Sequence, residues 1–313
     1  MVKVGILGLG KMGLRHLAAY HVLHMDVLGF DPDPKVLTAA SSHGVVTSES
    51  IEALLEAVDV VSVCAPVAGH DQLIRAAIEA GVHVLCEKPV VRDLATCDQL
   101  IEAEASSSLV IAGGYLMRFA AEVSSFGAAI GNPDHYGRPL FACITKTARG
   151  DHAAWKHLLG HGGGAGEEIL VHGLDLARHL FGELSSGLAA SELLLPVRQI
   201  GGEAVQVDAP DTVTEVLAAG GVPTILQANM LGQIPYTSLS VIFEEGTMHA
   251  RLGSAIVYEH RGGVQRSLPV QNRPWLLTQV QEFLDSVEQG RRLPRLHGLA
   301  DTRALLARRQ SYA

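Results

Sequence analysis

A glycine-rich turn near the start of the chain constrains the fold most. Residues 8–13 read GLGKMG; they follow an apolar segment at residues 2–7 and open a helical pattern. In this context the first glycine allows a tight turn, the second lets backbone approach a pyrophosphate, and the third lets the helix pack on the strand. The N–H groups at the start of the helix favour phosphate. The predicted dinucleotide contacts are Gly8, Gly10, Lys11, Met12 and Gly13.

Asp31 is predicted to bind the adenosine ribose of this dinucleotide. It follows the second apolar segment, residues 25–30, at about the 20-residue spacing where a carboxylate accepts hydrogen bonds from ribose hydroxyls. A carboxylate there repels a 2′-phosphate, and residues 32–34 supply no arginine. We therefore expect NAD, with NADP as the alternative because Lys35 is a nearby cation.

The pattern of apolar residues changes once along the chain. Through residue 119, short runs rich in Val, Ile and Leu alternate with helical patterns, which indicates βαβ units and strands buried on both faces. Strand-like segments then follow one another, interrupted by helical patterns at 167–180 and 275–289. The expected strands of this part are 140–145, 191–200, 212–218, 224–229, 239–243 and 255–259.

These patterns predict an α/β fold with two domains. Residues 1–119 are expected to form an N-terminal doubly wound parallel (Rossmann) sheet. Residues 120–313 are expected to form an α+β domain with an open, mainly antiparallel sheet.

Composition excludes several classes of function. The net charge of −9 argues against nucleic-acid binding, and no apolar stretch is long enough for a membrane span. The four cysteines show no metal spacing, and neither do His152, His157 and His161 with Glu167, so no metal is expected. With no secretory signal pattern at residues 1–10, we expect a cytoplasmic protein.

Lys88 is a candidate catalytic residue. It lies in the sequence Glu87-Lys88-Pro89, at the predicted carboxyl end of a strand, where doubly wound sheets bind ligands. A lysine fixed there could reach a nicotinamide ring and a substrate hydroxyl, and its charge would stabilise a developing alkoxide. The alternative is a solvated lysine at a strand end.

The glycine turn and five further elements carry a family resemblance: Cys64-Ala65-Pro66 followed by His70, GVHVLCEKP at 81–89, which contains the Lys88 motif, Arg118-Phe119, Trp155-Lys156, and GGG at 162–164 before a helix with His172 and Asp175. On these motifs the chain resembles the Gfo/Idh/MocA oxidoreductase family over nearly its whole length. The resemblance implies an NAD(P)-binding Rossmann domain, a substrate domain on an open sheet, and a homodimer or homotetramer formed through that sheet.

The polar stripe of the helix at 167–180 is a second candidate. Glu168, His172, Asp175 and His179 share one face, which for an arbitrary helix is the solvent face. In the family the equivalent histidine is the acid/base, with an Asp one turn earlier. The resemblance thus implies that His172 is the acid/base and that Glu168, one methylene longer, takes the place of that Asp.

The resemblance implies further site residues on both domains. The implied cofactor contacts are Ala65, Pro66, His70, Glu87 and Lys88. The implied substrate contacts are Lys88, Arg118, Trp155, Lys156, Glu168 and His172.

The expected activity is hydride transfer between a nicotinamide cofactor and a secondary alcohol or ketone of a sugar, cyclitol or related polyol. His172 takes the hydroxyl proton as hydride leaves carbon, Lys88 stabilises the oxygen, and Glu168 orients the pair. Two alternatives stay open: an NAD-using glycosidase or lyase of the same family with transient redox, and a non-catalytic dinucleotide-binding sensor. The presence of Lys88 and His172 argues against the sensor.

Overall fold

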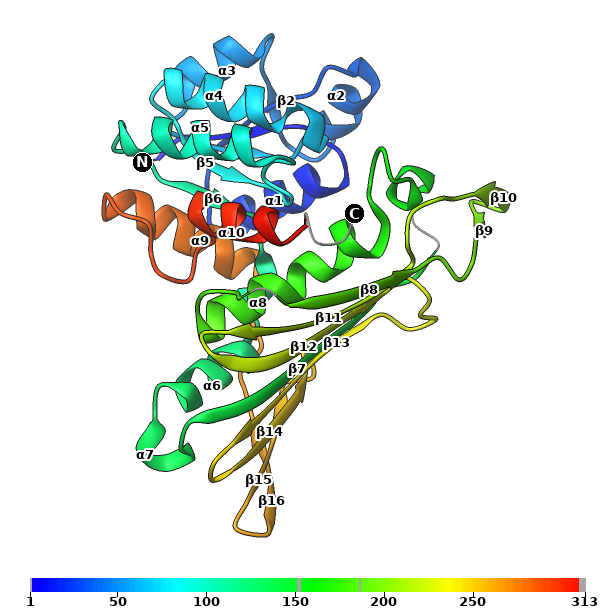
Figure 1. Cartoon of the computed structure of the whole chain (residues 1–313). Helices are drawn as coiled ribbons and strands as arrows, with labels where there is room; N and C mark the ends of the chain where they lie inside the picture. The colour runs from blue at the N-terminus through cyan, green and yellow to red at the C-terminus, as the bar shows by residue number, and fades with distance from the viewer. Residues whose placement is uncertain (1, 151–152, 186, 310–313) are drawn as a thin grey trace. The chain divides into compact units, whose positions relative to one another are not determined.

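Parallel strands form the sheet of the first part of the chain (Figure 1). We analysed a computed structural model that describes residues 2–150, 153–185 and 187–309. The strand order is β3-β2-β1-β4-β5-β6, and β1 lies in register between β2 and β4, with Val4 opposite Val27 and Val60. The order reverses between β1 and β4, the position where sheets of this type bind ligands. The strands are β1 (Val4–Leu7), β2 (Val27–Phe30), β3 (Val46–Thr47), β4 (Val60–Val63), β5 (His83–Cys86) and β6 (Ile111–Gly113).

Helices connect these strands, and side chains cap several of them. Asp33, Ser50 and Asp93 each accept a hydrogen bond from a backbone N–H in the first turn of the helix that follows. These caps fix where the chain turns from loop to helix. The helices are α1 (Lys11–Val22), α2 (Pro34–Ser41), α3 (Ile51–Ala57), α4 (His70–Glu79) and α5 (Leu94–Ala105).

Two C-terminal helices, α9 (Trp275–Glu288) and α10 (Leu299–Arg309), return to this part of the chain. The inner face of α9 carries Leu276, Val280 and Phe283, which pack in one core with Leu17 and Tyr20 of α1.

The contacts divide the chain into a first unit, Met1–Phe119 with Arg273–Leu306, and a second unit, Ala120–Asn272 with Ala307–Ala313. The division falls at Phe119, and residues 273–306 pack with the first unit, not with residues 120–272 as an undivided domain 120–313 would place them. The apolar stripe of α9 explains this difference, because it is buried against α1.

The second unit contains an eight-stranded sheet in the order β16-β15-β14-β13-β7-β12-β11-β8. β7 and β12 pair in parallel, and the other neighbours are antiparallel. The strands are β7 (Pro139–Thr147), β8 (Leu188–Glu192), β11 (Thr212–Ala219), β12 (Val222–Asn229), β13 (Tyr236–Phe243), β14 (Gly246–Arg251), β15 (Ile256–Arg261) and β16 (Val264–Pro269).

Helices α6 (Ala121–Ile130) and α8 (Val171–Phe181) pack on one face of this sheet, and the short α7 (Pro133–Tyr136) follows α6. Alternate residues of the strands are buried on that face; Gly173 of α8 lies over Leu226 and Ile144. A π-helical turn at Gly166–Leu170 leads into α8. The other sheet face is partly exposed and carries mixed polar and apolar side chains.

The strand predicted at 191–200 is two strands. β8 ends at Glu192, and β9 (Val197–Ile200) pairs instead with β10 (Glu203–Gln206). The chain turns between them because the Asp211 carboxylate accepts the backbone N–H groups of Leu194 and Leu195, which are therefore not available to a sheet partner. Asp211 is itself buried in an ion pair with Arg198, at 2.8 Å.

The predicted fold class is confirmed: a parallel Rossmann-type sheet precedes a mixed, mainly antiparallel sheet. The sequence patterns missed the short β3, the polar β10 and β16, β14, and helices α6, α7 and α10. None of the described helices has the length and apolar character needed to cross a membrane.

Candidate functional site

The glycine turn after β1 has the geometry that the sequence predicted. Gly8 has a φ of +93°, and a Cβ on it would come within 2.7 Å of the backbone nitrogen of Ala65. A Cβ on Gly13 would collide with the carbonyl oxygen of Gly8, so α1 can approach β1 only because Gly13 has no side chain. A Cβ on Gly10, by contrast, would meet no described atom within 4 Å.

The start of α1 is open toward this free space. Gly10 is the N-cap residue of α1, and no described side chain caps its first turn. The first N–H groups of a helix have no partner inside it, and the helix dipole makes this end attractive to anions. Lys11 and Met12 are the first residues of that turn. The cradle therefore fits the pyrophosphate of a dinucleotide.

Asp31 lies directly after β2 and holds the glycine turn in place. Its two carboxylate oxygens accept the backbone N–H groups of Leu9, at 2.9 Å, and Asp33, at 3.0 Å. Each carboxylate oxygen has a further lone pair, so these bonds leave acceptor capacity for ribose hydroxyls. The nearby Lys35 is exposed and belongs to the first turn of α2.

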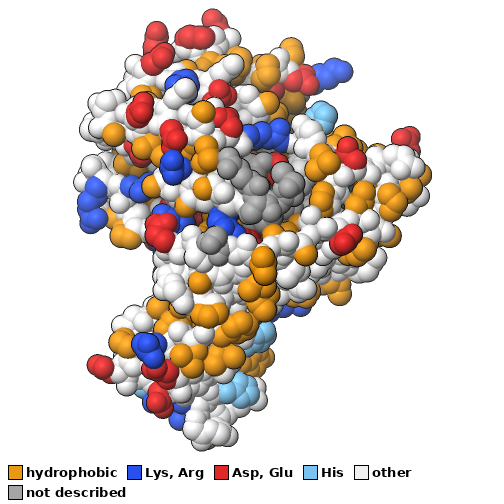
Figure 2. Space-filling model, in the orientation of Figure 1, with side chains coloured by type: hydrophobic (Ala, Val, Ile, Leu, Met, Phe, Trp, Pro, Cys, Tyr) orange, Lys and Arg blue, Asp and Glu red, His pale blue; other side chains and the backbone are white. Residues whose placement is uncertain are grey.

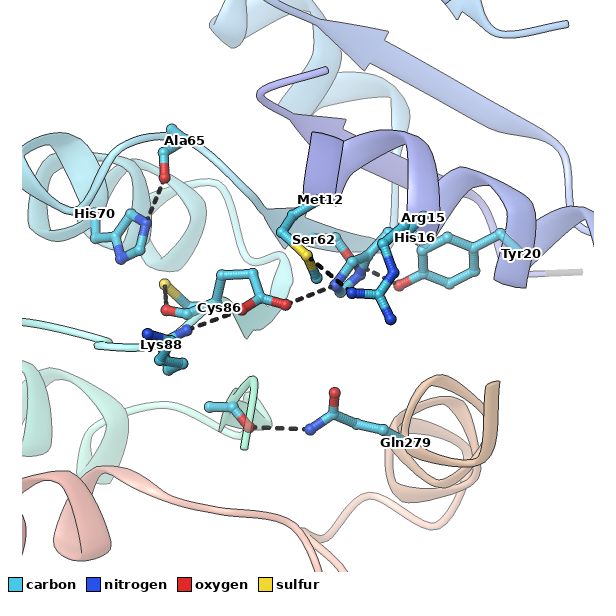
Figure 3. A network of polar contacts seen from close by, with 12 residues as sticks. Met12, Arg15, His16, Tyr20, Ser62, Ala65, His70, Cys86, Lys88 and Gln279 are labelled. Carbon is cyan, nitrogen blue, oxygen red and sulfur yellow. Dashed lines mark hydrogen bonds and ion pairs between the residues drawn. The ribbon is translucent and has the colours of Figure 1, made fainter. Parts of the chain in front are cut away.

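His70 joins two of the loops at the carboxyl edge of the sheet. Its ring is buried, with Nε2 2.8 Å from the Ala65 carbonyl oxygen and Nδ1 3.0 Å from the Pro89 carbonyl oxygen. The neutral ring donates to one of these carbonyls and the imidazolium to both. His70 thus links the Ala65-Pro66 loop to the turn that contains Lys88. Figure 3 shows its contact with Ala65.

Lys88 follows β5 directly and is half-buried, and the Lys88–Pro89 peptide bond is cis. Its backbone N–H donates to Oε2 of Glu87, at 3.2 Å. Burial by itself raises the pKa of Glu87, but its interactions with His16 and Lys88 outweigh burial and hold that pKa below its usual value. Glu87 is therefore a carboxylate at neutral pH, fixed beside Lys88.

Sequence reasoning missed His16, which contacts Glu87. His16 lies on α1, one helical turn after Gly13, and it is fully buried with Nε2 3.2 Å from Oε1 of Glu87. The signal was present in the sequence: a histidine three residues after the third glycine lies near the inward face of the helix. Its partner could not be identified without knowing which strand lies beneath α1.

Arg118 is buried in the first unit. Its guanidinium lies 3.2 Å from Nδ1 of His297 and 3.4 Å from the Asp301 carboxylate of α10. These contacts hold Arg118 within the protein, and its contact with substrate stays a prediction.

In the second unit, the predicted polar stripe is not a solvent face. Glu168, His172 and Asp175 are 7%, 9% and 1% exposed. Glu168 belongs to the π-helical turn and accepts a hydrogen bond from Nζ of Lys156, at 2.8 Å. π-Helical turns occur frequently at functional sites. The structure thus brings together three of the predicted substrate residues, because Lys156 also lies 5.2 Å above the ring of Trp155.

The glycine run at 162–164 lets protein segments approach each other rather than leaving an open cradle. A Cβ on Gly162 would collide with the backbone of Lys156, so the loop before the π-helical turn packs directly on the segment that carries Lys156. This contact places Lys156 within reach of Glu168.

The described residues contain no group of three or more His, Cys, Asp and Glu side chains arranged to hold a metal ion. His152, one of the histidines considered for such a group, lies outside the described residues. The prediction that no metal is bound therefore stays a prediction.

The strand order and the glycine turn at its reversal point define a Rossmann-type dinucleotide-binding protein. Residues 2–115 match the family model described as the Gfo/Idh/MocA oxidoreductase family, NAD-binding Rossmann fold.

Curated relatives are similar at low identity. The uncharacterized oxidoreductase YrbE of Bacillus subtilis is 24% identical over 253 residues, 79% of this chain and 65% of the relative. Myo-inositol 2-dehydrogenase of Thermotoga maritima is 26% identical over 206 residues, 64% of this chain and 61% of the relative. The alignments thus span less than two thirds of these relatives' own length.

Solved structures share the fold over 99% of the chain. UDP-N-acetylglucosamine 3-dehydrogenase GnnA from Acidithiobacillus ferrooxidans superposes with a TM-score of 0.84 at 21% identity, over 96% of its length. A levoglucosan dehydrogenase in complex with NADH gives 0.87 at 19% identity, over 95% of its length. At these identities the solved structures show a shared fold, and the match to the family model covers residues 2–115.

The glycine turn generates a test of the first unit's packing. We expect Gly13→Ala to lower the free energy of unfolding by at least about 2 kcal/mol, because the new methyl group forces α1 away from β1. Gly10→Ala is the matched control and should change stability by no more than about 0.5 kcal/mol. Urea unfolding of both variants measures the difference, and equal stabilities would contradict the described helix–strand contact.

Proposed function

We propose that this protein is an NAD-dependent oxidoreductase that transfers a hydride between the cofactor and a secondary alcohol or ketone of a sugar, cyclitol or related polyol. The observation that carries the proposal lies within the first unit: the open glycine cradle and Lys88 are both at the carboxyl edge of the parallel sheet. At that edge a dinucleotide binds and a cationic side chain can stabilise the charge that develops during redox chemistry.

This geometry supports the proposed cofactor-binding residues. The N-terminus of α1, with Gly10, Lys11 and Met12, would hold the pyrophosphate, and Asp31 would accept hydrogen bonds from the adenosine ribose. The loop of Ala65 and Pro66, fixed by His70, and the turn of Glu87 and Lys88 complete the cofactor site. The chemistry that a bound nicotinamide supplies is acceptance or donation of a hydride.

The chain's own residues handle the proton and the oxygen. We assign His172 as the base that takes the hydroxyl proton in oxidation, since imidazole titrates near neutral pH. The Lys88 ammonium stabilises the negative charge that develops on the oxygen. Glu168 orients the substrate or His172, and its ion pair with Lys156 fixes the longer side chain in one position.

The substrate class is supported by what relatives are named for. Among them are dehydrogenases of myo-inositol, UDP-N-acetylglucosamine and levoglucosan, all of which are compounds with a ring that carries hydroxyl groups. Trp155, 45% exposed and beside Lys156, offers an apolar surface with an adjacent cation for such a ring. Arg118 stays a further predicted contact.

The first test is turnover. Reduction of NAD and NADP is measured with a panel of sugars, polyols, cyclitols and nucleotide sugars, for the wild type and for Lys88→Met. We expect turnover of at least one class of substrate by the wild type. In Lys88→Met turnover should fall at least about a hundredfold, because the cation that stabilises the developing negative charge on the oxygen is lost. Turnover of the His172→Asn variant should fall by a similar factor, because the base is removed.

Val46→Ala is a control for this assay, since Val46 is exposed on the edge strand β3. Equal turnover in Lys88→Met and wild type would exclude the role of Lys88. Saturable NADH binding without net NAD reduction on any substrate of the panel would contradict the proposed dehydrogenase. It would favour an NAD-using glycosidase or lyase with transient redox, or a non-catalytic sensor.

Asp31 is expected to select NAD over NADP. A carboxylate at this position repels a 2′-phosphate, so the wild type should bind NADH at least about tenfold more tightly than NADPH, a difference of ~1.4 kcal/mol. Asp31→Ser should remove most of that preference. Asp33→Ser is the matched control because serine also caps α2. Fluorescence titration measures the dissociation constants of NADH and NADPH for all three proteins, and an unchanged NADH/NADPH ratio in Asp31→Ser would assign selectivity elsewhere.

We also propose that the chain forms a homodimer or homotetramer through the uncovered face of its large sheet, and that it works in the cytoplasm. Register places Val216, Ile225, Phe141 and Ile242 on the face opposite α8. Val216 and Ile242 are 48% and 42% exposed, and Figure 2 shows hydrophobic side chains on the part of the molecule that carries this sheet. Exposed apolar groups on a sheet face of this kind mark interaction surfaces.

Light scattering coupled to size exclusion tests the assembly. We expect the wild type to be dimeric or tetrameric and Ile242→Asp to shift toward monomer, because a charge would be buried in the interface. Val46→Asp, on exposed β3 of the first unit, should keep the wild-type mass. A monomeric wild type would contradict the proposal.

A further inference from the structure

A buried chain of polar contacts connects α1 to the backbone of Lys88 (Figure 3). The hydroxyl groups of Tyr20 and Ser62 lie 2.8 Å apart, and Ser62 Oγ lies 3.0 Å from Nδ1 of His16. Nε2–H of His16 donates to Oε1 of Glu87, at 3.2 Å, and Oε2 of Glu87 accepts the Lys88 N–H. All of these residues belong to the first unit. The function proposed above uses Lys88 but gives no role to His16.

Glu87 needs a partner because it is a carboxylate in the interior. It is only 8% exposed, and an unpaired buried carboxylate is strongly destabilising. His16 is fully buried beside it. The two side chains therefore stabilise each other as a buried, hydrogen-bonded pair rather than as a solvent-screened surface contact.

The charge state of His16 follows from its neighbours. Burial by itself lowers the pKa of His16, but the hydrogen bond and the negative charge of Glu87 act against burial, and the pKa of His16 lies above its usual value. Burial in turn raises the pKa of the Cys64 thiol, which keeps the thiol neutral near pH 7. Tyr20, with its pKa also raised by burial, is neutral as well. Glu87 is thus the negative charge that stabilises an imidazolium at His16.

The geometry links this pair to the position of Lys88. Both Glu87 oxygens are engaged, one by the His16 ring and the other by the Lys88 backbone, so a rotation of the Glu87 side chain would break both bonds. Gly114 closes the space beside Glu87, since a Cβ on it would lie 3.1 Å from Oε2. On the other side of Lys88, the Pro89 carbonyl is held by His70.

We propose that His16 is a positioning residue for Lys88: as the charged partner of Glu87, it fixes the strand end from which Lys88 reaches the reacting oxygen. The catalytic part of this inference rests on the function proposed above, because that function gives Lys88 its role. The link from His16 to the Lys88 backbone can be measured without any turnover.

The first experiment measures backbone hydrogen exchange at Lys88 in the full chain. We expect the Lys88 backbone amide to exchange at least about tenfold faster in His16→Gln than in wild type, because Glu87 loses the side chain that holds it. Tyr20→Phe is the matched control: it removes a hydroxyl from the far end of the same network and should stay within about threefold of wild type. Unchanged protection in His16→Gln would overturn the proposal.

The second experiment observes the His16 ring directly, and it decides the question if His16→Gln does not fold. In wild-type protein with ¹³C-labelled histidine, the His16 signal should remain that of an imidazolium at pH 8, where an ordinary histidine is neutral. In Glu87→Gln the same signal should be that of the neutral ring. A neutral His16 in the wild type at pH 7 would overturn the proposed charged pair.

The third experiment separates positioning from a general effect on folding. With a substrate found in the panel, His16→Gln should lower kcat at least about tenfold while the Kd for NADH changes less than about threefold, since the glycine cradle is untouched. Tyr20→Phe should keep wild-type kcat. An unchanged kcat in His16→Gln would overturn the proposal that His16 positions Lys88 for catalysis. Absence of turnover in wild type would contradict the proposed function itself, whereas exchange and NMR would still decide the link to Lys88.

Discussion

The close approach of α1 to β1 is the contact on which the first unit depends. Because Gly13 has no side chain, the helix packs against the carbonyl of Gly8, and its next inward-facing positions, His16 and Tyr20, lie over β4. The same approach opens the N-terminus of α1 toward a ligand. One steric requirement thus determines both the phosphate cradle and the buried polar network beneath the end of β5, and a larger residue at position 13 would disturb both.

The parts of the fold that could be predicted are those whose signals are local. The apolar segments expected at residues 2–7 and 25–30 contain β1 and β2. The helices after Asp33, Ser50 and Asp93 begin at capping residues that the sequence shows. The elements that were missed depend on distant contacts. β16 is an exposed polar edge strand with no apolar alternation. The division at 192–197 depends on Asp211, which lies just before β11, 17 residues after Leu194.

The same distinction holds for the site. Gly8, Gly13 and Asp31 could be identified because the spacing of the dinucleotide motif encodes backbone geometry. Lys88 became a candidate through its place at the end of a predicted strand and His172 through resemblance, and the catalytic role of each stays a prediction. His16 could not be found in this way, because its importance arises from a contact with a residue 71 positions away in the chain. Buried charge pairs of this kind are visible only once strand order is known.

Glu168 is a buried carboxylate whose position is fixed by its neighbours. A Glu in place of Asp adds a methylene, and a longer side chain has more rotamer freedom to lose when it is fixed. Here the carboxylate is 7% exposed and is held by Lys156, whose backbone is in turn held by the direct packing of Gly162. The π-helical turn changes the helical register at the same position. The packing of Gly162 on the Lys156 backbone and the hydrogen bond from Lys156 to Glu168 therefore fix where the longer carboxylate lies.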